Sequence, residues 1–293
     1  MKTRSYLYII AAAVLWGLIG IFVKSIAAQG FSSMQIVALR AIASASCITL
    51  VLLWQGIEKL KIALRDLWMF VGTGICSLVF FNFCYFNCIQ ASSLAVAALL
   101  LYTAPIFVML MSLVLFGEHF TVKKGIALVC TFGGCACVTG ALDGGLSLTF
   151  SGLLYGLGSG LGYALYSIFG KYAVQKYSSL TITAYTFYIA LLAAVPMAGF
   201  DAASLAQLNL ATIGGALGLG LICAVIPYLL YTLGLEQVEP GQASILATIE
   251  PFVAAGVGML FFAEPMTLTK ALGMLLIFGS IVILNLPYKQ QSA

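Results

Sequence analysis

Charged residues are scarce in this chain. They make up 8% of its 293 residues, whereas hydrophobic residues make up 62%. A soluble domain averages about 25% charged and about 45–50% apolar residues. A water-soluble protein cannot hide so much apolar surface, so the composition predicts an integral membrane protein whose main partner is the lipid bilayer. The net charge of +4 is then no signature of a nucleic-acid partner.

Residues that carry catalytic or metal chemistry are also few. The single histidine, His119, has no metal-ligand spacing around it, so neither an enzyme nor a metal site is expected. The eight cysteines all lie in apolar segments, where packing between helices is the expected role. The pairs Cys84/Cys88 and Cys135/Cys137 keep metal or redox chemistry open as an alternative. No nucleotide-binding loop or other cofactor motif occurs, which argues against direct drive by ATP.

Long apolar runs are what the chain does contain. Runs of about 20 apolar residues mark membrane-spanning helices. The first run follows basic residues and resembles a signal peptide, but its length favours a permanent helix. We predict ten spans, at residues 6–27, 33–54, 67–89, 94–116, 125–141, 152–174, 181–199, 211–233, 241–262 and 271–287.

Basic residues are distributed unevenly between the two sides that these spans define. With the N-terminus inside, Lys24 and Lys270 fall outside, and Arg40 falls within a span. Cytoplasmic loops carry the excess of Lys and Arg, so both termini are predicted to be cytoplasmic. The ten residues that fall inside are Lys2, Arg4, Lys59, Lys61, Arg65, Lys123, Lys124, Lys171, Lys176 and Lys289.

The sequence repeats itself at one fixed offset. "LYTAPIFVMLMSLVLFGEHFTVKKG" (101–125) matches "ATIEPFVAAGVGMLFFAEPMTLTKA" (247–271), and the offset between Pro105 and Pro251 is 146 (251 − 105). The same offset aligns Glu118 with Glu264 and "FSSMQIVA" with "YSSLTITA". The predicted repeats are 1–146 and 147–293. This agreement also supports retention of the first apolar run, because its counterpart in the second repeat has no signal-peptide role.

An odd number of helices in each repeat has a topological consequence. Five helices bring the chain to the opposite side, so the second repeat enters the membrane inverted relative to the first. Inverted repeats are typical of secondary transporters, whose binding site lies near the midplane between the repeats. The predicted fold is therefore all-α, with ten transmembrane helices in two five-helix inverted-topology repeats.

The paired motifs resemble a known family. "APIFVMLMSLVLFGE" and "EPFVAAGVGMLFFAE" are similar to the two signatures of the EamA family, in the drug/metabolite transporter superfamily of ten-helix permeases. Ala263-Glu264 departs slightly from the usual Gly-Glu of that family. The resemblance covers nearly the whole chain and implies a bacterial inner-membrane permease, often an exporter of amino acids or related metabolites. It identifies no particular substrate.

Glu250 and Pro251 lie together near the middle of the ninth span. Proline leaves the carbonyl four residues earlier without its helical donor, and this applies to Pro105, Pro227 and Pro251. A carboxylate at this depth costs at least about 2.5 kcal/mol, which favours a partner, a hydrated cavity or protonation. Arg40 is the candidate partner. Glu250 is thus predicted to bind an ammonium group, to carry a proton or to tie helices together, and these alternatives remain open.

Aromatic and amide side chains occupy the middle of several other spans. Asn82 and Tyr85 share one helix face, as do Tyr163 and Tyr166. An apolar cavity with a few polar groups is the usual form of a small-molecule site. Aromatic packing without a ligand is the alternative for each residue. The predicted substrate-binding residues are Trp16, Asn82, Tyr85, Tyr102, Tyr163, Tyr166, Tyr228 and Glu250, and the predicted structural residues are Arg40, Pro105, Glu118, Pro251 and Glu264.

These features together predict a secondary transporter of small metabolites that works by alternating access, with protons as the candidate coupling ion. The competing functions are a channel-like uniporter, a membrane scaffold and a membrane-embedded enzyme. A channel would show no counterflow, and a scaffold has no need of polar groups at the midplane. The sequence carries no information on oligomeric state.

Overall fold

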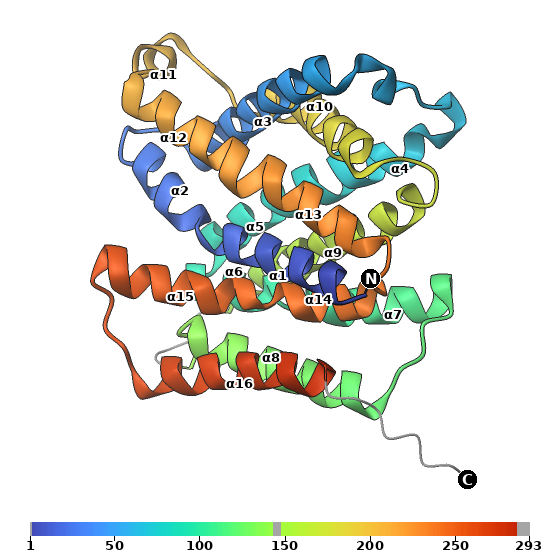
Figure 1. Ribbon diagram of the computed structural model, residues 1–293. Coiled ribbons are helices and arrows are strands. Elements are labelled where there is room, and N and C mark those ends of the chain that lie inside the picture. Colours follow the sequence, from blue (N-terminus) through green and yellow to red (C-terminus); the bar gives the residue numbers. More distant parts are fainter. Residues whose placement is uncertain (1, 143–147, 286–293) are drawn as a thin grey trace.

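The protein is an assembly of packed helices in the computed structural model, which describes residues 2–142 and 148–285 (Figure 1). Every regular element in these ranges is helical. The elements before residue 143 are α1 (Lys2–Gly17), α2 (Ile19–Ala27), α3 (Ser33–Gln55), the short turns η1 (Ile57–Leu60) and η2 (Leu64–Asp66), α4 (Leu67–Val71), η3 (Gly72–Val79), α5 (Phe80–Ala91), α6 (Leu94–Leu101), α7 (Ala104–Phe116) and α8 (Val122–Val138).

The later elements follow the same order. They are α9 (Phe150–Ala173), α10 (Ser179–Met197), the short α11 (Ala202–Ala206), α12 (Leu210–Gly220), η4 (Leu221–Val225), α13 (Ile226–Leu235), α14 (Pro240–Ala247), α15 (Ile249–Phe262) and α16 (Leu268–Asn285). Helices occupy all ten predicted ranges. The boundary between the predicted repeats, Lys289, and residues 286 and 287 of the tenth predicted span lie outside the described residues.

Seven helices of the described residues are long and apolar enough to cross a membrane. They correspond to the predicted spans one to four and seven to nine. Residues Leu268–Leu284 form a shorter apolar helix, α8 has 17 residues, and the many glycines and tyrosines of α9 lower its hydropathy. The chain is therefore a multi-pass membrane protein, and the number ten stays a prediction.

Helix starts agree between the two halves of the chain. The Ser32 hydroxyl accepts from the Gln35 amide at 3.3 Å to cap α3, and Ser178, 146 positions later, caps α10 in the same way at 3.2 Å. A side-chain oxygen at this position satisfies one of the free amides of the first helical turn. Thr121 caps α8 at 3.3 Å, and its equivalent Thr267 accepts from the Lys270 amide at 3.1 Å.

Helix irregularities also agree between the halves. α6 and α7 are separated at Tyr102–Thr103, and α14 and α15 at the equivalent Thr248. Two of the mid-span prolines follow these breaks, because a proline cannot donate to the preceding turn. The segments η3 and η4 are π-helical and occupy overlapping equivalent positions. Both halves therefore share departures from α-helix geometry that neither periodicity nor composition predicts.

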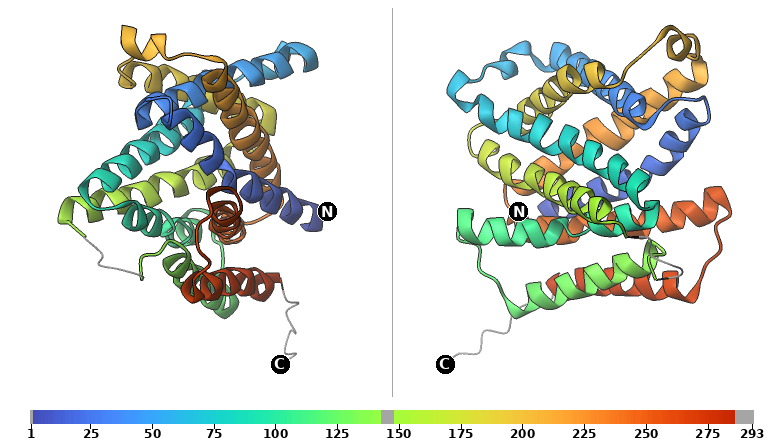
Figure 2. Two further views of the ribbon diagram at one scale, coloured as in Figure 1. Left: turned by 90° about the vertical axis from the view of Figure 1, so that its left-hand side faces the viewer. Right: turned by 180° about the vertical axis from the view of Figure 1, so that it is seen from behind.

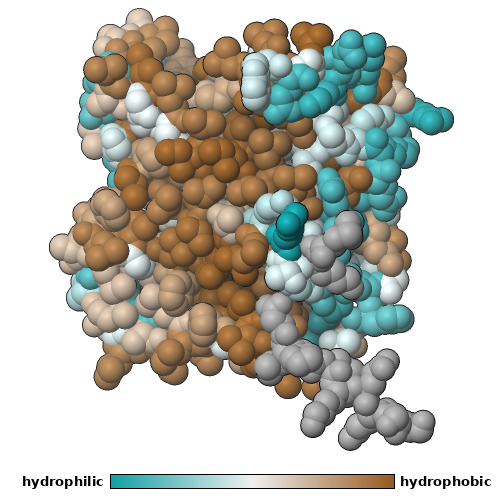
Figure 3. Space-filling view, viewed as in Figure 1, coloured by the Kyte–Doolittle hydropathy of each residue, from teal (hydrophilic) through white to brown (hydrophobic). Residues whose placement is uncertain are grey.

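The two halves point in opposite directions. The turn from α7 to α8 lies at the right of Figure 1, and the equivalent turn from α15 to α16 lies at the left. α8 and α16 pack side by side as an outer layer at the bottom of Figure 1, beneath the row formed by α15, α14 and α7 (Figures 1 and 2). Hydrophilic side chains gather along the right-hand edge of the surface in Figure 3, and brown apolar side chains cover the broad middle.

Candidate functional site

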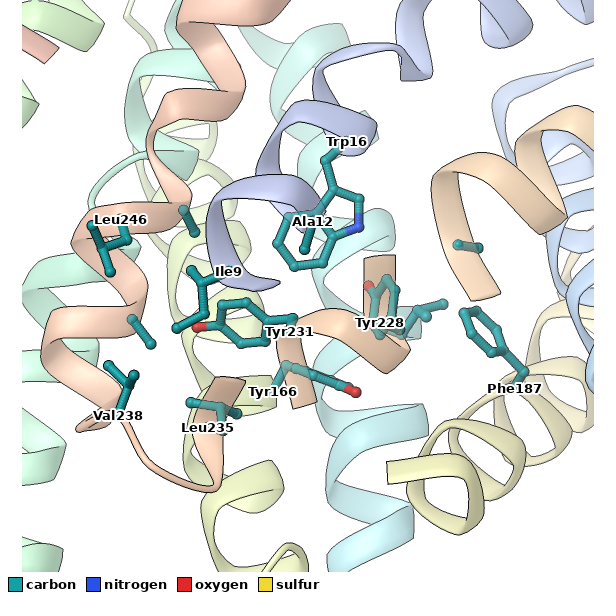
Figure 4. Close-up of a cluster of buried hydrophobic side chains, with 14 of the residues drawn as sticks. Ile9, Ala12, Trp16, Tyr166, Phe187, Tyr228, Tyr231, Leu235, Val238 and Leu246 are labelled. Carbon is teal, nitrogen blue, oxygen red and sulfur yellow. The ribbon is translucent and has the colours of Figure 1, made fainter. Parts of the chain in front are cut away.

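Aromatic rings from three helices converge in the middle of the molecule (Figure 4). Trp16 of α1 lies 5.4 Å from Tyr228 and 5.3 Å from Tyr231 of α13, measured between ring centroids. Tyr166 of α9 packs edge-on against Tyr228 at 4.7 Å. All four side chains are buried. The three-residue spacing between Tyr228 and Tyr231 puts both rings on the face of α13 that meets α1 and α9.

Neighbouring hydroxyl groups satisfy the polar ends of these rings. The Tyr166 hydroxyl lies 2.8 Å from the Thr232 hydroxyl, and the Tyr231 hydroxyl lies 2.7 Å from that of Ser167. Buried hydroxyls without partners would be destabilising. These pairs fix the ring orientations and leave the ring faces to line a cavity.

The central cavity lies between these rings. The space between the rings is so narrow that it holds at most about one water molecule. A metabolite does not fit between the rings in this arrangement. The lining residues are Trp16, Ser77, Phe81, Tyr163, Tyr166, Ser167, Tyr228 and Tyr231.

Glu250 lies beside this cavity, in the first turn of α15. The Tyr163 hydroxyl donates to its carboxylate at 2.9 Å, and Tyr163 packs against Trp16 at 6.2 Å and Phe81 at 5.8 Å. The backbone of Glu250 touches α1, because a Cβ on Gly17 would come within 3.0 Å of the Glu250 carbonyl oxygen. The helix break at Thr248 thus places a half-buried carboxylate against Tyr163, which forms an aromatic wall with Trp16, Tyr166 and Tyr228.

Arg40 does not serve as the ion-pair partner of Glu250. Among the described residues the ion pairs join other side chains, although the charges of Arg40 and Glu250 act on each other at longer range. Arg40 Nη2 instead donates to the Cys223 carbonyl at 3.2 Å. That carbonyl is the one that Pro227 deprives of its helical donor. The guanidinium also lies 5.8 Å from the centre of the Tyr228 ring.

Three predicted site residues lie apart from the cavity lining. The Asn82 amide donates at 2.7 Å to the Leu78 carbonyl of its own helix. Tyr85 packs near Cys88, and Tyr102 packs among α8, α15 and α16. These three residues therefore lie outside the ring cavity in this structure.

Several lining residues were not predicted. Phe81, Ser77 and Ser167 line the cavity without having been expected there, and Tyr231 lines it although it was not counted among the predicted binding residues. Tyr231 had a usable signal, since it aligns with Tyr85 in the repeat and lies three residues after Tyr228. Ser77 and Phe81 sit in and just after the π-helical η3, whose altered register conceals which face points inward.

The predicted motif glutamates lie far from the cavity, at the two ends of the molecule. The Glu118 carboxylate pairs with Lys124 at 2.8 Å, and Glu264 pairs with Lys270 at 3.1 Å. Pro105 and Pro251 lie in the first turns of α7 and α15, immediately after the helix breaks. The two prolines thus follow the helix breaks, and the two glutamates lie just beyond the C-terminal ends of α7 and α15.

The described residues form neither a metal site nor a disulfide. Across residues 2–142 and 148–285, no three His, Cys, Asp or Glu side chains come together to hold a metal ion. All eight cysteines are free. The alternative reading of Cys84/Cys88 and Cys135/Cys137 as ligand or redox pairs thus has no geometric support in this part of the chain.

Comparison with known proteins gives a consistent result. The model of the EamA-like transporter family matches this chain twice, at residues 3–140 and 150–286. An uncharacterized transporter of Archaeoglobus fulgidus is 32% identical over 94% of both chains. The uncharacterized transporter YwfM of Bacillus subtilis is 24% identical over 100% of this chain and 98% of its own.

A solved structure supports the fold alone. One crystal structure superimposes with a TM-score of 0.84 at 18% identity, covering 97% of each chain. The relatives bear the names of transporters and not of enzymes. The double family match, the close relative and the packed membrane helices lead to one conclusion: this chain belongs to the EamA-like transporter family, and it is a membrane transporter, not an enzyme.

Proposed function

We propose that the protein is a secondary transporter that crosses the membrane ten times in two inverted five-helix repeats, residues 1–146 and 147–293. Support comes from the equivalent caps, helix breaks and π-helical segments at an offset of 146, and from the opposite directions of the equivalent turns. Lys24 and Lys270, the two basic residues expected outside, both meet Glu264 at one end. We place that end outside and both termini in the cytoplasm of a bacterial inner membrane.

The substrate is a small metabolite with a cationic group, an amino acid or a related amine. Glu250 binds this group, and the rings of Trp16, Tyr163, Tyr166 and Tyr228 enclose the apolar part. Asn82, Tyr85 and Tyr102 complete the site when the cavity widens. The direction, export, rests on the resemblance to exporters of the family.

One observation carries this proposal. The Glu250 carboxylate, near the middle of a broken membrane helix, has a tyrosine hydroxyl of the aromatic wall as its hydrogen-bond partner, not an arginine or lysine. A carboxylate kept only for helix–helix adhesion would be expected to pair with Arg40, which instead binds the Cys223 carbonyl. An ammonium ion is attracted both to a carboxylate and to the faces of aromatic rings, so this combination favours its binding.

The test uses purified protein reconstituted into liposomes. A thermal-shift screen of amino acids and amines first identifies a ligand, because a ligand that binds the folded state raises the melting temperature. Counterflow of that radiolabelled ligand and transport driven by a pH gradient are then measured for the wild type and Glu250→Gln. Glu58→Gln, at an exposed position in η1, is the matched control.

Each result has a distinct meaning. Substrate binding predicts that Glu250→Gln weakens both transport modes at least about tenfold, while Glu58→Gln changes neither. Loss of pH-driven transport with intact counterflow assigns proton carriage to Glu250 and overturns ammonium binding. Normal affinity and pH dependence in both modes remove Glu250 from the site. Ion conduction without counterflow contradicts a transporter and indicates a channel.

A further inference from the structure

The two ends of the molecule carry equivalent residues in different states. At one end Lys124 lies between two carboxylates, 2.8 Å from Glu118 and 2.7 Å from Glu239. The second Glu118 oxygen accepts from the Gly241 amide at 3.0 Å. Glu118 and Lys124 belong to the first repeat, and Glu239 and Gly241 to the second. The Glu118 cluster, defined as Glu118, Lys124 and Glu239, therefore ties the repeats together.

The opposite end is tied together more loosely, through exposed side chains. Glu264 and Lys270, the equivalents of Glu118 and Lys124, form an ion pair at 3.1 Å, but the Glu264 side chain is 42% exposed. Lys24 lies 3.7 Å away and is itself 56% exposed. By contrast, the Lys124 and Glu118 side chains are 5% and 2% exposed. The Glu264 cluster, defined as Lys24, Glu264 and Lys270, is open where the Glu118 cluster is closed.

Helix packing shows the same asymmetry. At the closed end α7 packs along α14, whereas the equivalent pair, α15 and α6, has no comparable packing. Ile245 of α14 is fully buried with Met109 of α7. The equivalents are Leu99, which stays partly exposed, and Ala255, which packs with Val138 and Met274 without Leu99.

We propose that the Glu118 cluster is a gate that is closed in this structure, and that the equivalent Glu264 cluster closes in the opposite state by docking on the first turn of α6 at Ala95. Two repeats of one design can exchange conformations, so each end has an open and a closed form. In the opposite state the Glu264 carboxylate accepts from the Ala95 amide, the equivalent of Gly241, and Leu99 packs on Ala255. This inference rests on the proposed alternating access.

The side chains at the two ends fit this exchange but not equally well. A Cβ on Gly241 would come within 2.5 Å of the Glu118 carboxylate and 3.0 Å of the Met109 sulfur, so only glycine permits this approach. At the other end Ala95 carries a Cβ, and Ala255 replaces Met109 and provides the space for it.

Charge also distinguishes the two gates. Glu239 supplies Lys124 with a second carboxylate, whereas Ser93 stands at the position equivalent to Glu239. Lys270 therefore shares one carboxylate with Lys24, while Lys124 pairs with two carboxylates. The Glu118 gate is the firmer of the two, and the state closed at that end is the resting state.

Cross-linking of cysteine pairs tests the exchange. In a chain whose eight native cysteines are replaced, Met109→Cys/Ile245→Cys reports closure at the Glu118 end, and Leu99→Cys/Ala255→Cys reports closure at the Glu264 end. The first pair should link quickly and the second slowly. Adding Glu118→Gln/Lys124→Gln should accelerate linking of the second pair about tenfold, and the control Glu264→Gln/Lys270→Gln should slow it.

A glycine variant checks the gate without removing its charges. Gly241→Ala should accelerate linking of Leu99→Cys/Ala255→Cys, because the added methyl group meets Glu118. The control Gly256→Ala adds a methyl group that meets nothing within 4 Å and should change no rate. The gate is overturned if Leu99→Cys/Ala255→Cys links in no variant. It is also overturned if that pair links at the same rate with Gly241→Ala as with Gly256→Ala.

The same preparations separate the gate from the proposed function. Counterflow of the ligand identified by thermal shift is measured alongside the cross-linking. Counterflow without any linking of the second pair refutes the gate while transport stands. Linking that responds as expected, without counterflow of any ligand, supports the gate motion and refutes the proposed transport.

Discussion

Arg40 and Pro227 act together at the scale of single residues, although they belong to different helices. Pro227 leaves the Cys223 carbonyl without a helical donor, and Arg40 Nη2 supplies one at 3.2 Å. Both the acceptor and the donor can be identified in the sequence. The freed carbonyl follows from the proline, and Arg40 is the basic residue placed well inside a span. Their pairing is not predictable from sequence, because no pattern within either segment encodes the distance between α3 and α13, and a carboxylate is the expected partner of a buried arginine.

A double-mutant cycle tests this pairing. Arg40→Gln should lower the free energy of unfolding by about 1.5–3 kcal/mol, because a buried carbonyl loses a charged donor. In a Pro227→Ala chain the loss should be about half as large, since the new amide offers a donor within the helix. Chemical denaturation in detergent measures both. Additive effects of the two changes would contradict the pairing.

Glu250 shows the limit of residue-level reasoning from sequence. Its depth and the adjacent proline are enough to predict a functional carboxylate, and four of the aromatic residues that surround the cavity are predicted from their mid-span positions. Its hydrogen bond with Tyr163 depends on how α9 crosses α15, which no local pattern encodes. Asn82 shows the converse, since a polar side chain in mid-span can satisfy itself on its own helix.

The π-helical segments are the main surprise at the scale of elements. η3 begins at Gly72, and the equivalent Gly218 lies just before η4. An ideal Cβ on Gly72 would overlap the Phe169 ring, and one on Gly218 would overlap the Phe22 ring. Each glycine thus admits an aromatic ring from a crossing helix. π-Helical turns are rare and cluster at functional sites, and η3 here contributes Ser77 to the cavity.

Alanine substitutions test this close packing. Gly72→Ala and Gly218→Ala should each lower the melting temperature, with a loss of about 1–3 kcal/mol from overpacking. Gly133→Ala and Gly279→Ala are matched controls, because their added methyl groups meet nothing within 4 Å. The controls should be neutral or slightly stabilising, as expected for glycine replaced by alanine within a helix. Equal melting temperatures for all four variants would contradict the packing role.

Element boundaries are partly predictable, for identifiable reasons. The apolar runs locate helices in all ten ranges, and Ser or Thr before a run marks several of the starts. The break of the first run at Leu18, between α1 and α2, follows Gly17 and is not marked by a proline. It occurs where α1 meets α15 at Gly17 and Glu250. Glycine weakens a helix at this point, but the close contact with α15 is not visible in the periodicity of one segment.

The whole molecule is organised by the offset of 146 residues. The repeat found in the sequence extends in the structure to caps, left-handed residues and ion pairs: Gly117 and Ala263 both have positive φ after α7 and α15, and each is followed by a glutamate paired with a lysine. The sequence predicts this correspondence but not the difference between the ends. Equivalent residues are closed at one end and open at the other because the whole molecule adopts one of two conformations. The sequence is compatible with both conformations and does not indicate which one is adopted.

Opposite sidedness of the two equivalent turns is the prediction that tests this organisation. His119, after α7, and Pro265, after α15, lie in turns at opposite ends of the molecule (Figure 1). Single cysteines at these positions, in a cysteine-free chain expressed in bacterial cells, should differ in labelling by a membrane-impermeant maleimide. Because Lys and Arg are enriched on the cytoplasmic side, His119→Cys should label only after the cells are opened, and Pro265→Cys should label in intact cells. Labelling of both positions from one side would exclude the inverted repeat and, with it, the exchange of gates between the two ends.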